Sequence, residues 1–361
     1  MNGPVRVLVV DDSALMRKLI PQILQADSSI QVVGTAMDGN FGLKKISELK
    51  PQVVTLDLEM PGMNGLDMLK EIMLRHPVPV IVVSSHSTGG ASVTLKALSL
   101  GAFDFVAKPA DVSARMPEIA QELISKIKAA AQSRGFLVKP LPPFQSPRRG
   151  ERSAQDPKRQ ATRVVAIGIS TGGPQALQYL LPQLPADFGG TMLVVQHMPE
   201  GFTDMFAKRL DEVCAIRVKE AQSGDMLLAG RALICPGNRH LKVKKLPLGD
   251  VVVLGDEPRV NGHRPSVDVL FRSLADEFGS RGMAVLMTGM GDDGAQGLGA
   301  VKAAGGVTVA QSEDSCVVYG MPKAAIDRGF ATRVVSLDAL ANTLIAQCKA
   351  GGEHAAGAGR G

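Results

Sequence analysis

Five polar residues in the first third of the chain have the types and spacing to bind a cation and a phosphoryl group. Each stands at the end of a short apolar run: Asp11, Asp12, Asp57, Ser84 and Lys108. Converging carboxylates repel each other unless a divalent cation joins them, and an all-oxygen ligand set suits Mg²⁺. A lysine and a hydroxyl beside them can hold phosphoryl oxygens. The alternative, that Asp11-Asp12 only caps the next helix, leaves the other three positions unexplained.

A serine further along the chain has the setting of a nucleophile. Ser170 lies in Gly168-Ile169-Ser170-Thr171-Gly172, which matches G-x-S-x-G and follows an apolar run. In a strand-to-helix turn this pattern raises the serine hydroxyl above the sheet edge. The backbone N–H groups that follow it, at a helix N-terminus, can stabilise an oxyanion. A glycine-rich phosphate turn is the alternative, but neither G-x-G-x-x-G nor a P-loop lysine is present.

His197 is the histidine best placed to take a proton from Ser170. It directly follows the apolar run Thr191–Gln196, about one βαβ unit after the serine. Adjacent parallel strands would bring the two residues to neighbouring strand ends, where a general base is needed. His240 and His263 lie beside turn sequences, and we expect them at most to line the site.

Two adjacent aspartates can supply the group that orients the histidine. Asp292 and Asp293 follow the apolar run Met283–Thr288. One of them can hold the imidazole and stabilise its cation, and the other can cap the helix expected near Gly294. The order serine, histidine, aspartate differs from that of α/β-hydrolases, so the motif does not predict that fold.

The elements that must position these residues alternate between strand and helix. Before residue 129 the expected strands are Val5–Val10, Ile30–Thr35, Val53–Asp57, Val80–Ser84 and Phe103–Ala107. Helix-length amphipathic segments such as Ala14–Gln25 and Gly65–Arg75 lie between them. Continuous apolar strands alternating with helices predict a parallel (βα)5 sheet buried on both faces. Ligands bind such sheets at the carboxyl ends of the strands.

A second α/β region begins after a basic, proline-rich segment. Residues 129–162 carry seven Lys/Arg, two Asp/Glu and five Pro, and we predict that they form a linker. Beyond it we expect a Rossmann-like doubly wound sheet over residues 163–350, with a β-hairpin near Leu241–Leu254. Residues 351–361, rich in Gly and Ala, predict a flexible tail.

Composition excludes several classes of protein. The chain has 361 residues, 45% of them hydrophobic, and no apolar run of the length that a membrane span needs, so no membrane insertion is expected. The net charge of +5 equals the excess carried by residues 129–162, so no folded domain presents a basic face for nucleic acid. The four cysteines show no C-x-x-C spacing, which is typical of a reduced, cytoplasmic chain.

Residues 1–128 resemble the receiver domain of bacterial two-component response regulators. The resemblance rests on VLVVDDSALMR, VVTLDLEMPGMNGLDML, VPVIVVSS and GAFDFVAKP. It implies that Asp57 accepts a phosphoryl group from a histidine kinase and that Asp11, Asp12 and Asp57 bind Mg²⁺. It also implies that Ser84 and Lys108 contact the phosphoryl group. Ser85 competes for the hydroxyl role, and Phe105 occupies the place of the family's switch aromatic.

The C-terminal region resembles the catalytic domain of the chemotaxis protein-glutamate methylesterases. The matching segments are GISTGGP, QHMPEGFT, CPGNRHL, RPSVDVLF, MTGMGDDGAQG and GMPKAAI. The resemblance implies that Ser170 is the nucleophile, His197 the base and Asp293 the catalytic aspartate. Asp292 departs from the asparagine often found there, and would raise the basicity of His197 only if it pointed inward. Met290 lies in the family's active-site loop.

Together the two resemblances imply an esterase that is activated by phosphorylation. Its substrates would be glutamyl methyl esters on chemoreceptors, and it would also deamidate receptor glutamines. Mg²⁺ would serve the receiver domain, and ester hydrolysis would need no cofactor. The alternative is a response regulator with a non-enzymatic binding output, which would require a recognition element such as a basic helix after the linker.

Overall fold

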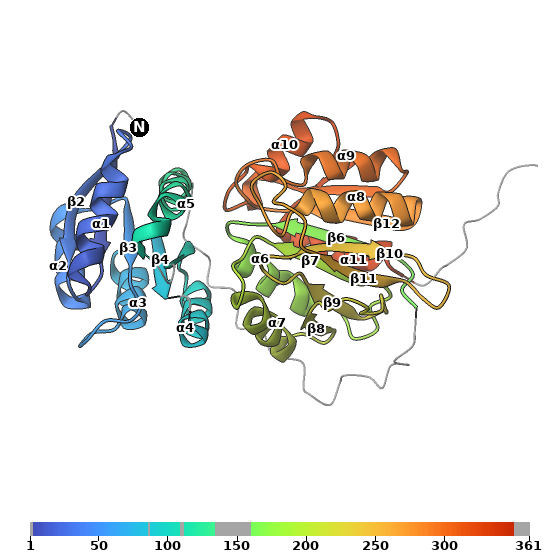
Figure 1. Cartoon of the computed structure of the whole chain (residues 1–361), viewed down its shortest axis with the longest axis horizontal. Coiled ribbons are helices and arrows are strands. Elements are labelled where there is room, and N and C mark those ends of the chain that lie inside the picture. The colour runs from blue at the N-terminus through green and yellow to red at the C-terminus, as the bar shows by residue number, and fades with distance from the viewer. Residues whose placement is uncertain (1–2, 86, 109–111, 134–159, 350–361) are drawn as a thin grey trace, which may run out of the picture. The chain divides into compact units, whose positions relative to one another are not determined.

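The computed structural model describes residues 3–85, 87–108, 112–133 and 160–349. The chain divides into an N-terminal unit, Met1–Pro143, and a C-terminal unit, Phe144–Gly361 (Figure 1). Among the described residues, no helix has the length and apolar character that crossing a membrane requires.

The N-terminal unit is built on a five-stranded parallel sheet in the order β2-β1-β3-β4-β5. The strands are β1 (Val5–Val10), β2 (Ile30–Ala36), β3 (Val53–Leu56), β4 (Val80–Ser85) and β5 (Asp104–Lys108). The helices are α1 (Ala14–Gln25), α2 (Gly39–Leu49), α3 (Gly65–Arg75), α4 (Thr88–Ser99) and α5 (Val112–Gln132). The (βα)5 prediction is confirmed.

Helix α1 is capped by Ser13, which tests the alternative that Asp11-Asp12 only caps this helix. The Ser13 hydroxyl accepts a hydrogen bond from the Met16 N–H, as an N-cap side chain does. Asp11 instead accepts from the Ser13 N–H, at 2.9 Å, and lies buried at the end of β1. The interpretation of Asp11-Asp12 as a mere helix cap is therefore wrong.

The predicted linker needs a correction at both ends. Helix α5 continues to Gln132, so residues 129–132 belong to the helix. At the other end, Gln160 forms a bridge with Leu228, and the Thr162 N–H donates to the Gly189 carbonyl at 2.9 Å. Residues 160–162 thus belong to the C-terminal unit. Residues 134–159, and the predicted tail at 351–361, lie outside the described residues.

The C-terminal unit is built on a seven-stranded parallel sheet in the order β14-β13-β12-β6-β7-β9-β8. The strands are β6 (Val164–Ile169), β7 (Thr191–Gln196), β8 (Arg217–Glu220), β9 (Arg231–Ile234), β12 (Gly282–Leu286), β13 (Val307–Gln311) and β14 (Arg333–Val335). The predicted hairpin is the antiparallel pair β10 (His240–Lys244) and β11 (Val251–Gly255).

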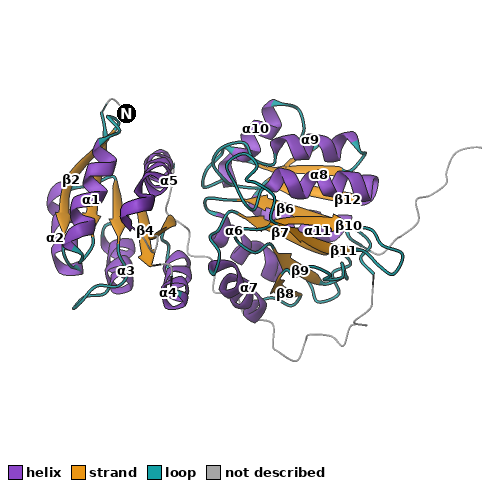
Figure 2. Cartoon of the chain, viewed as in Figure 1, coloured by secondary structure: helices purple, strands orange, loops and turns teal. Residues whose placement is uncertain are grey.

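Helices cover both faces of this sheet, as the doubly wound prediction requires (Figure 2). They are α6 (Gly173–Leu180), α7 (Phe202–Val213), α8 (Val267–Phe278), α9 (Ala295–Ala303), α10 (Met321–Asp327) and α11 (Leu337–Gln347). After β6 the chain builds outward through β7, then returns to place β12 on the other side of β6. The end of β6 is therefore the switch point in strand order, where ligands of such sheets bind.

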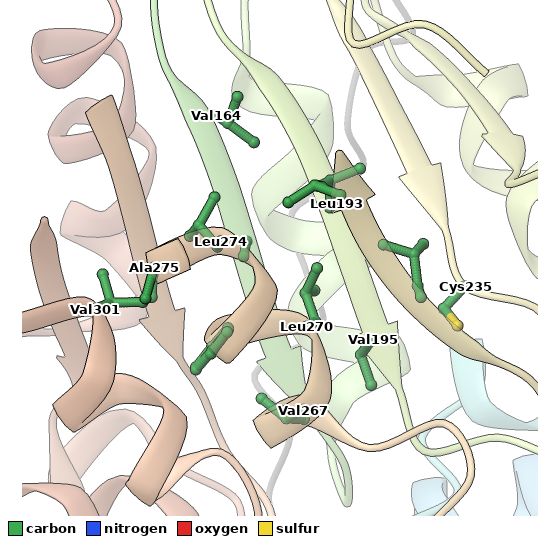
Figure 3. Packing of buried hydrophobic residues seen from close by; sticks show 14 of the residues in the cluster. Val164, Leu193, Val195, Cys235, Val267, Leu270, Leu274, Ala275 and Val301 are labelled. Atoms are coloured by element: carbon green, nitrogen blue, oxygen red, sulfur yellow. The ribbon is translucent and has the colours of Figure 1, made fainter. Parts of the chain in front are cut away.

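Helix α8 packs closely on the middle of the sheet. Figure 3 shows Leu270 and Leu274 of α8 beside Leu193 and Val195 of β7, in a cluster whose members are almost fully buried. The helix approaches β6 so closely that a Cβ at Gly168 would lie 2.1 Å from Val267 Cγ1. This contact fixes the N-terminus of α8 next to the carboxyl end of β6.

Candidate functional site

Ser170 lies in the turn between β6 and α6, at the switch point. Its N–H donates to the Thr288 carbonyl at 2.9 Å, which ties the turn to the segment after β12. Gly172, with φ 78°, caps α6 in the left-handed conformation that glycine adopts at little cost. Gly289 lies so close that a Cβ there would be 2.8 Å from Ser170 Cβ. The serine is therefore held in place by the segment that follows β12.

The turn leaves two backbone N–H groups available beside the serine. Thr171 and Gly172 are buried, and their N–H groups donate to no acceptor within the part of the chain that the structure describes. They lie at the N-terminus of α6, where unpaired N–H groups carry partial positive charge. This is the arrangement that an oxyanion hole requires.

His197 lies directly after β7 and contacts both other members of the predicted triad. Its Nδ1 is 3.2 Å from Ser170 Oγ, and its Nε2 is 2.9 Å from Asp293 Oδ2. Because the Nε2–H donates a hydrogen bond to the carboxylate, Nδ1 carries no hydrogen and is free to accept a hydrogen bond from the serine hydroxyl. The three residues that the sequence predicts therefore form one chain of hydrogen bonds.

Asp293 is buried and surrounded by donors. Besides His197, it accepts hydrogen bonds from Ser266 Oγ at 2.8 Å and from the Val267 N–H at 2.7 Å. Asn261 Nδ2 donates at 3.0 Å, and the Asp268 N–H at 3.3 Å. Burial alone raises the pKa of Asp293, but the hydrogen bond and charge of His197, with the bonds from Asn261 and Val267, hold the pKa well below its ordinary value.

Asp292 points away from this site. Its side chain is 58% exposed and pairs with Arg328 at 2.8 Å, so it does not act on His197. Neither aspartate caps α9, because the cap residue is Gly294 and no side chain bonds there. Met290, in the same loop, is partly exposed.

Two further histidines lie around the triad, as expected for residues lining the site. The His263 ring stacks on His197 with centroids 3.9 Å apart. His240 is fully buried and accepts from the Ser266 N–H at 3.2 Å, while its Nε2 lies 3.1 Å from the Pro258 carbonyl. It therefore holds the residue whose hydroxyl bonds Asp293. Asn261 and Ser266 could not be picked out from the sequence as site residues, because they lie in and just after a loop without apolar periodicity.

The N-terminal unit brings its predicted acidic residues together at one edge of the sheet. Carboxylate oxygens of Asp11, Asp12 and Asp57 lie within 4.8 Å of one another. Lys108, at the end of β5, lies 2.7 Å from Asp57 and 3.0 Å from Asp11. Burial has the largest influence on Asp11 and raises its pKa. The attraction of Lys108 lowers this pKa and the repulsion of Asp57 raises it, and the net result is a raised pKa. Three clustered hard oxygen donors with a net negative charge fit Mg²⁺.

The other residues predicted in the receiver are Ser84, Ser85 and Phe105. Each of them contacts a group outside the carboxylate cluster. The Ser84 hydroxyl is buried and donates to the Gly90 carbonyl at 3.4 Å. Ser85 lies instead against the Glu59 carboxylate, at 3.3 Å. The Phe105 ring is buried, with the Lys126 ammonium 5.4 Å from its centroid.

Comparison with known proteins agrees with this geometry. Residues 165–344 match the CheB methylesterase family, and residues 7–120 match the response regulator receiver domain. A protein-glutamate methylesterase/protein-glutamine glutaminase 2 of Koribacter versatilis is 62% identical over 96% of this chain and 97% of its own length. A protein-glutamate methylesterase/protein-glutamine glutaminase of Pyrococcus horikoshii is 45% identical over 96% and 94%.

A solved structure supports the same assignment for the C-terminal unit. The CheB methylesterase catalytic domain of Thermotoga maritima superposes with a TM-score of 0.51 and 39% identity, covering 52% of this chain and 98% of that one. With sequence, domain order and fold in agreement, the chain belongs to the CheB methylesterase family and carries a response regulator receiver domain at its N-terminal end.

Proposed function

We propose that this chain hydrolyses γ-glutamyl methyl esters on chemoreceptors, releasing methanol, and that it deamidates glutamines of the same receptors. The observation that carries the proposal is the continuous hydrogen-bond chain Ser170, His197, Asp293 at the switch point of the sheet. The names of the relatives, which join the two activities, support this choice of substrate.

In the proposed reaction Ser170 Oγ attacks the ester carbonyl carbon, and its proton passes to His197 Nδ1. Asp293 stabilises the imidazolium through the bond to Nε2. The Thr171 and Gly172 N–H groups donate to the oxyanion. As the C–O bond breaks, His197 returns the proton to the leaving methanol. Water, activated by His197, then hydrolyses the acyl-enzyme. With glutamine the leaving group is ammonia, so the same residues serve both substrates.

The receiver domain supplies the regulation in this proposal. Asp57 accepts a phosphoryl group from a histidine kinase, Lys108 and Ser84 contact that group, and Asp11, Asp12 and Asp57 hold Mg²⁺. When bound, the ion neutralises charge on the carboxylates and the phosphoryl oxygens. We also propose a cytoplasmic location, and a division into a regulatory part, a basic linker and a catalytic part. Phosphorylation needs to change the free-energy difference between the inactive and active states by only a few kcal/mol.

A binding output without catalysis is the competing function. It does not account for a serine, a histidine and an aspartate joined in one hydrogen-bond chain at the switch point of the sheet. We therefore prefer the esterase.

Methanol release from methylated chemoreceptor membranes tests the proposal. We expect release by the full chain to rise when acetyl phosphate and Mg²⁺ are added. Release should disappear in Ser170→Ala and lose its response to acetyl phosphate in Asp57→Ala. Absence of release from several receptor preparations, with the receiver shown to be phosphorylated, would contradict the esterase and favour deamidation or a binding output.

A further inference from the structure

Gln196, the last residue of β7, touches the backbone of two triad members at once. Its side-chain Nε2 donates to the Ser170 carbonyl at 3.0 Å and to the His197 carbonyl at 3.1 Å. The residue is 2% exposed, so solvent does not compete for these bonds. Because both partners are carbonyls, only the amide NH₂ can face them.

These bonds begin where the sheet ends. The register of β6 with β7 runs to Ile169 opposite Gln196, and the His197 N–H then donates to the Ile169 carbonyl at 3.1 Å. Past this point the two strands turn into separate loops. The Gln196 amide makes the next link between them, and with the Gly173 N–H, at 2.8 Å, it fills both lone pairs of the Ser170 carbonyl.

The arrangement carries a cost that stability alone does not explain. Gln196 Oε1 is buried, and no donor in the described parts of the chain bonds it. A buried unpaired acceptor destabilises a fold. The neighbouring turn is also restricted, because a Cβ at Gly173 would lie 1.9 Å from that oxygen. Glycine at 173 is what leaves room for the amide.

We propose that Gln196 is a positioning residue that sets the distance and orientation of Ser170 relative to His197. It acts through their main chains and does not contact the substrate. This inference rests on the proposed function, since it assigns a role within the same triad. Displacements of about 1 Å at a reacting group cost on the order of 100-fold in rate, so the link affects turnover more than binding.

The primary test replaces Gln196 with methionine, which keeps the volume and removes both donors. With the full chain, acetyl phosphate and Mg²⁺, we expect kcat for methanol release to fall about 10- to 100-fold while KM stays within about twofold. The second-order rate of Ser170 labelling by diisopropyl fluorophosphate should fall by a similar factor. An unchanged kcat and labelling rate in folded Gln196→Met would overturn the proposal.

A second variant tests the same link if Gln196→Met does not fold. Gly173→Ala leaves the glutamine in place but pushes its amide away from the two carbonyls, and should also slow labelling. Normal labelling in Gly173→Ala would then overturn the proposal. Leu193→Ala is the matched control, since Leu193 is a buried residue of the same strand that lies opposite Ala166, before the end of β6. It should lower the melting temperature and leave kcat unchanged; an equal loss of kcat there would reduce Gln196 to a structural role.

The labelling measurement separates this inference from the choice of substrate. If the wild type labels at Ser170 but releases no methanol, the substrate proposal fails. The comparison of variants then still decides the role of Gln196. If the phosphorylated wild type does not label at all, Ser170 is not an activated nucleophile, and both proposals fall.

Discussion

The two parallel sheets of this chain both collect polar side chains at their carboxyl edges, but they treat carboxylates in opposite ways. Asp293 accepts from five donors, and the pKa of its carboxyl is lowered. In the receiver, three carboxylates cluster around a single lysine, and the pKa of Asp11 is raised. One edge satisfies its anion completely, and the other leaves excess negative charge.

The difference shows how parallel sheets of two different topologies can each build a polar site at the carboxyl ends of their strands. A carboxylate with every lone pair bonded stays charged and fixed, as an orienting group for histidine must. A cluster with too few donors has affinity for a cation instead. The number of donors per carboxylate, set by the loops, therefore separates the proposed catalytic edge from the proposed phosphoryl-accepting edge.

Removal of the nucleophile should have the largest effect, and only on the catalytic edge. Ser170→Ala deletes the attacking oxygen, and we expect kcat for methanol release to fall by about 10⁵-fold. Phosphorylation of Asp57, followed with radiolabelled acetyl phosphate, should be unchanged. Substantial residual release would mean that another group is the nucleophile.

Neutralising the fully bonded carboxylate should be nearly as damaging. Asp293→Asn places an amide against donors that need an anion and favours the wrong tautomer of His197, so kcat should fall by about 10⁴-fold. The adjacent Asp292→Asn is the control: its side chain is exposed and pairs with Arg328, away from the triad, so kcat should change by less than about twofold. Equal losses in the two variants would contradict the assignment of Asp293.

Replacing the proposed phosphoryl acceptor should abolish regulation and leave the hydrolysis itself intact. Asp57→Asn keeps the shape of the side chain but cannot be phosphorylated, so the response to acetyl phosphate should disappear while basal methanol release remains. We expect the lost stimulation to be on the order of 10-fold, the scale of typical coupling between two sites. A stimulation that persists in Asp57→Asn would show that phosphorylation acts elsewhere.

The smallest expected effect is on the stability of the receiver, where Asp11, Asp12 and Asp57 cluster. A carboxyl whose pKa is raised by folding binds its proton more tightly in the folded state, so stability falls as pH rises through that pKa. Asp11→Asn should therefore raise the melting temperature of the receiver by a few degrees at pH 7 without Mg²⁺. The gain should shrink as the pH is lowered, because the wild-type carboxyl then takes up its proton. A lower melting temperature at pH 7 would show that the attraction between Asp11 and Lys108 outweighs burial.

Much of the fold can be read from the sequence, because its strands are buried on both faces. The predicted limits of β1, α1, α3 and β7 agree with the structure to the residue. Where the apolar pattern fades, prediction fails: residues 129–132 continue α5 as Ala-Ala-Ala-Gln, which carries little periodicity. Alanine favours helix whatever its position, so a change in composition was mistaken for an end of structure.

The site residues likewise fall into those that the strand pattern predicts and those that depend on loops. Ser170 and His197 follow core strands directly, so their neighbourhood could be predicted from strand order. The donors to Asp293 could not, because Asn261 and Ser266 reach it from the segment that leads into α8. The stacking of His263 on His197 also depends on a loop whose path no local pattern specifies.

The position of β6 between β7 and β12 has a consequence for how the enzyme is made. A nascent chain releases the receiver first, and domains generally fold in that order. Ser170 and His197 emerge next, yet Gly282 pairs with Val164 only after a long stretch has been synthesised. Such non-local pairing forms slowly. The triad is therefore incomplete until β12 has paired with β6 and Asp293 has reached His197.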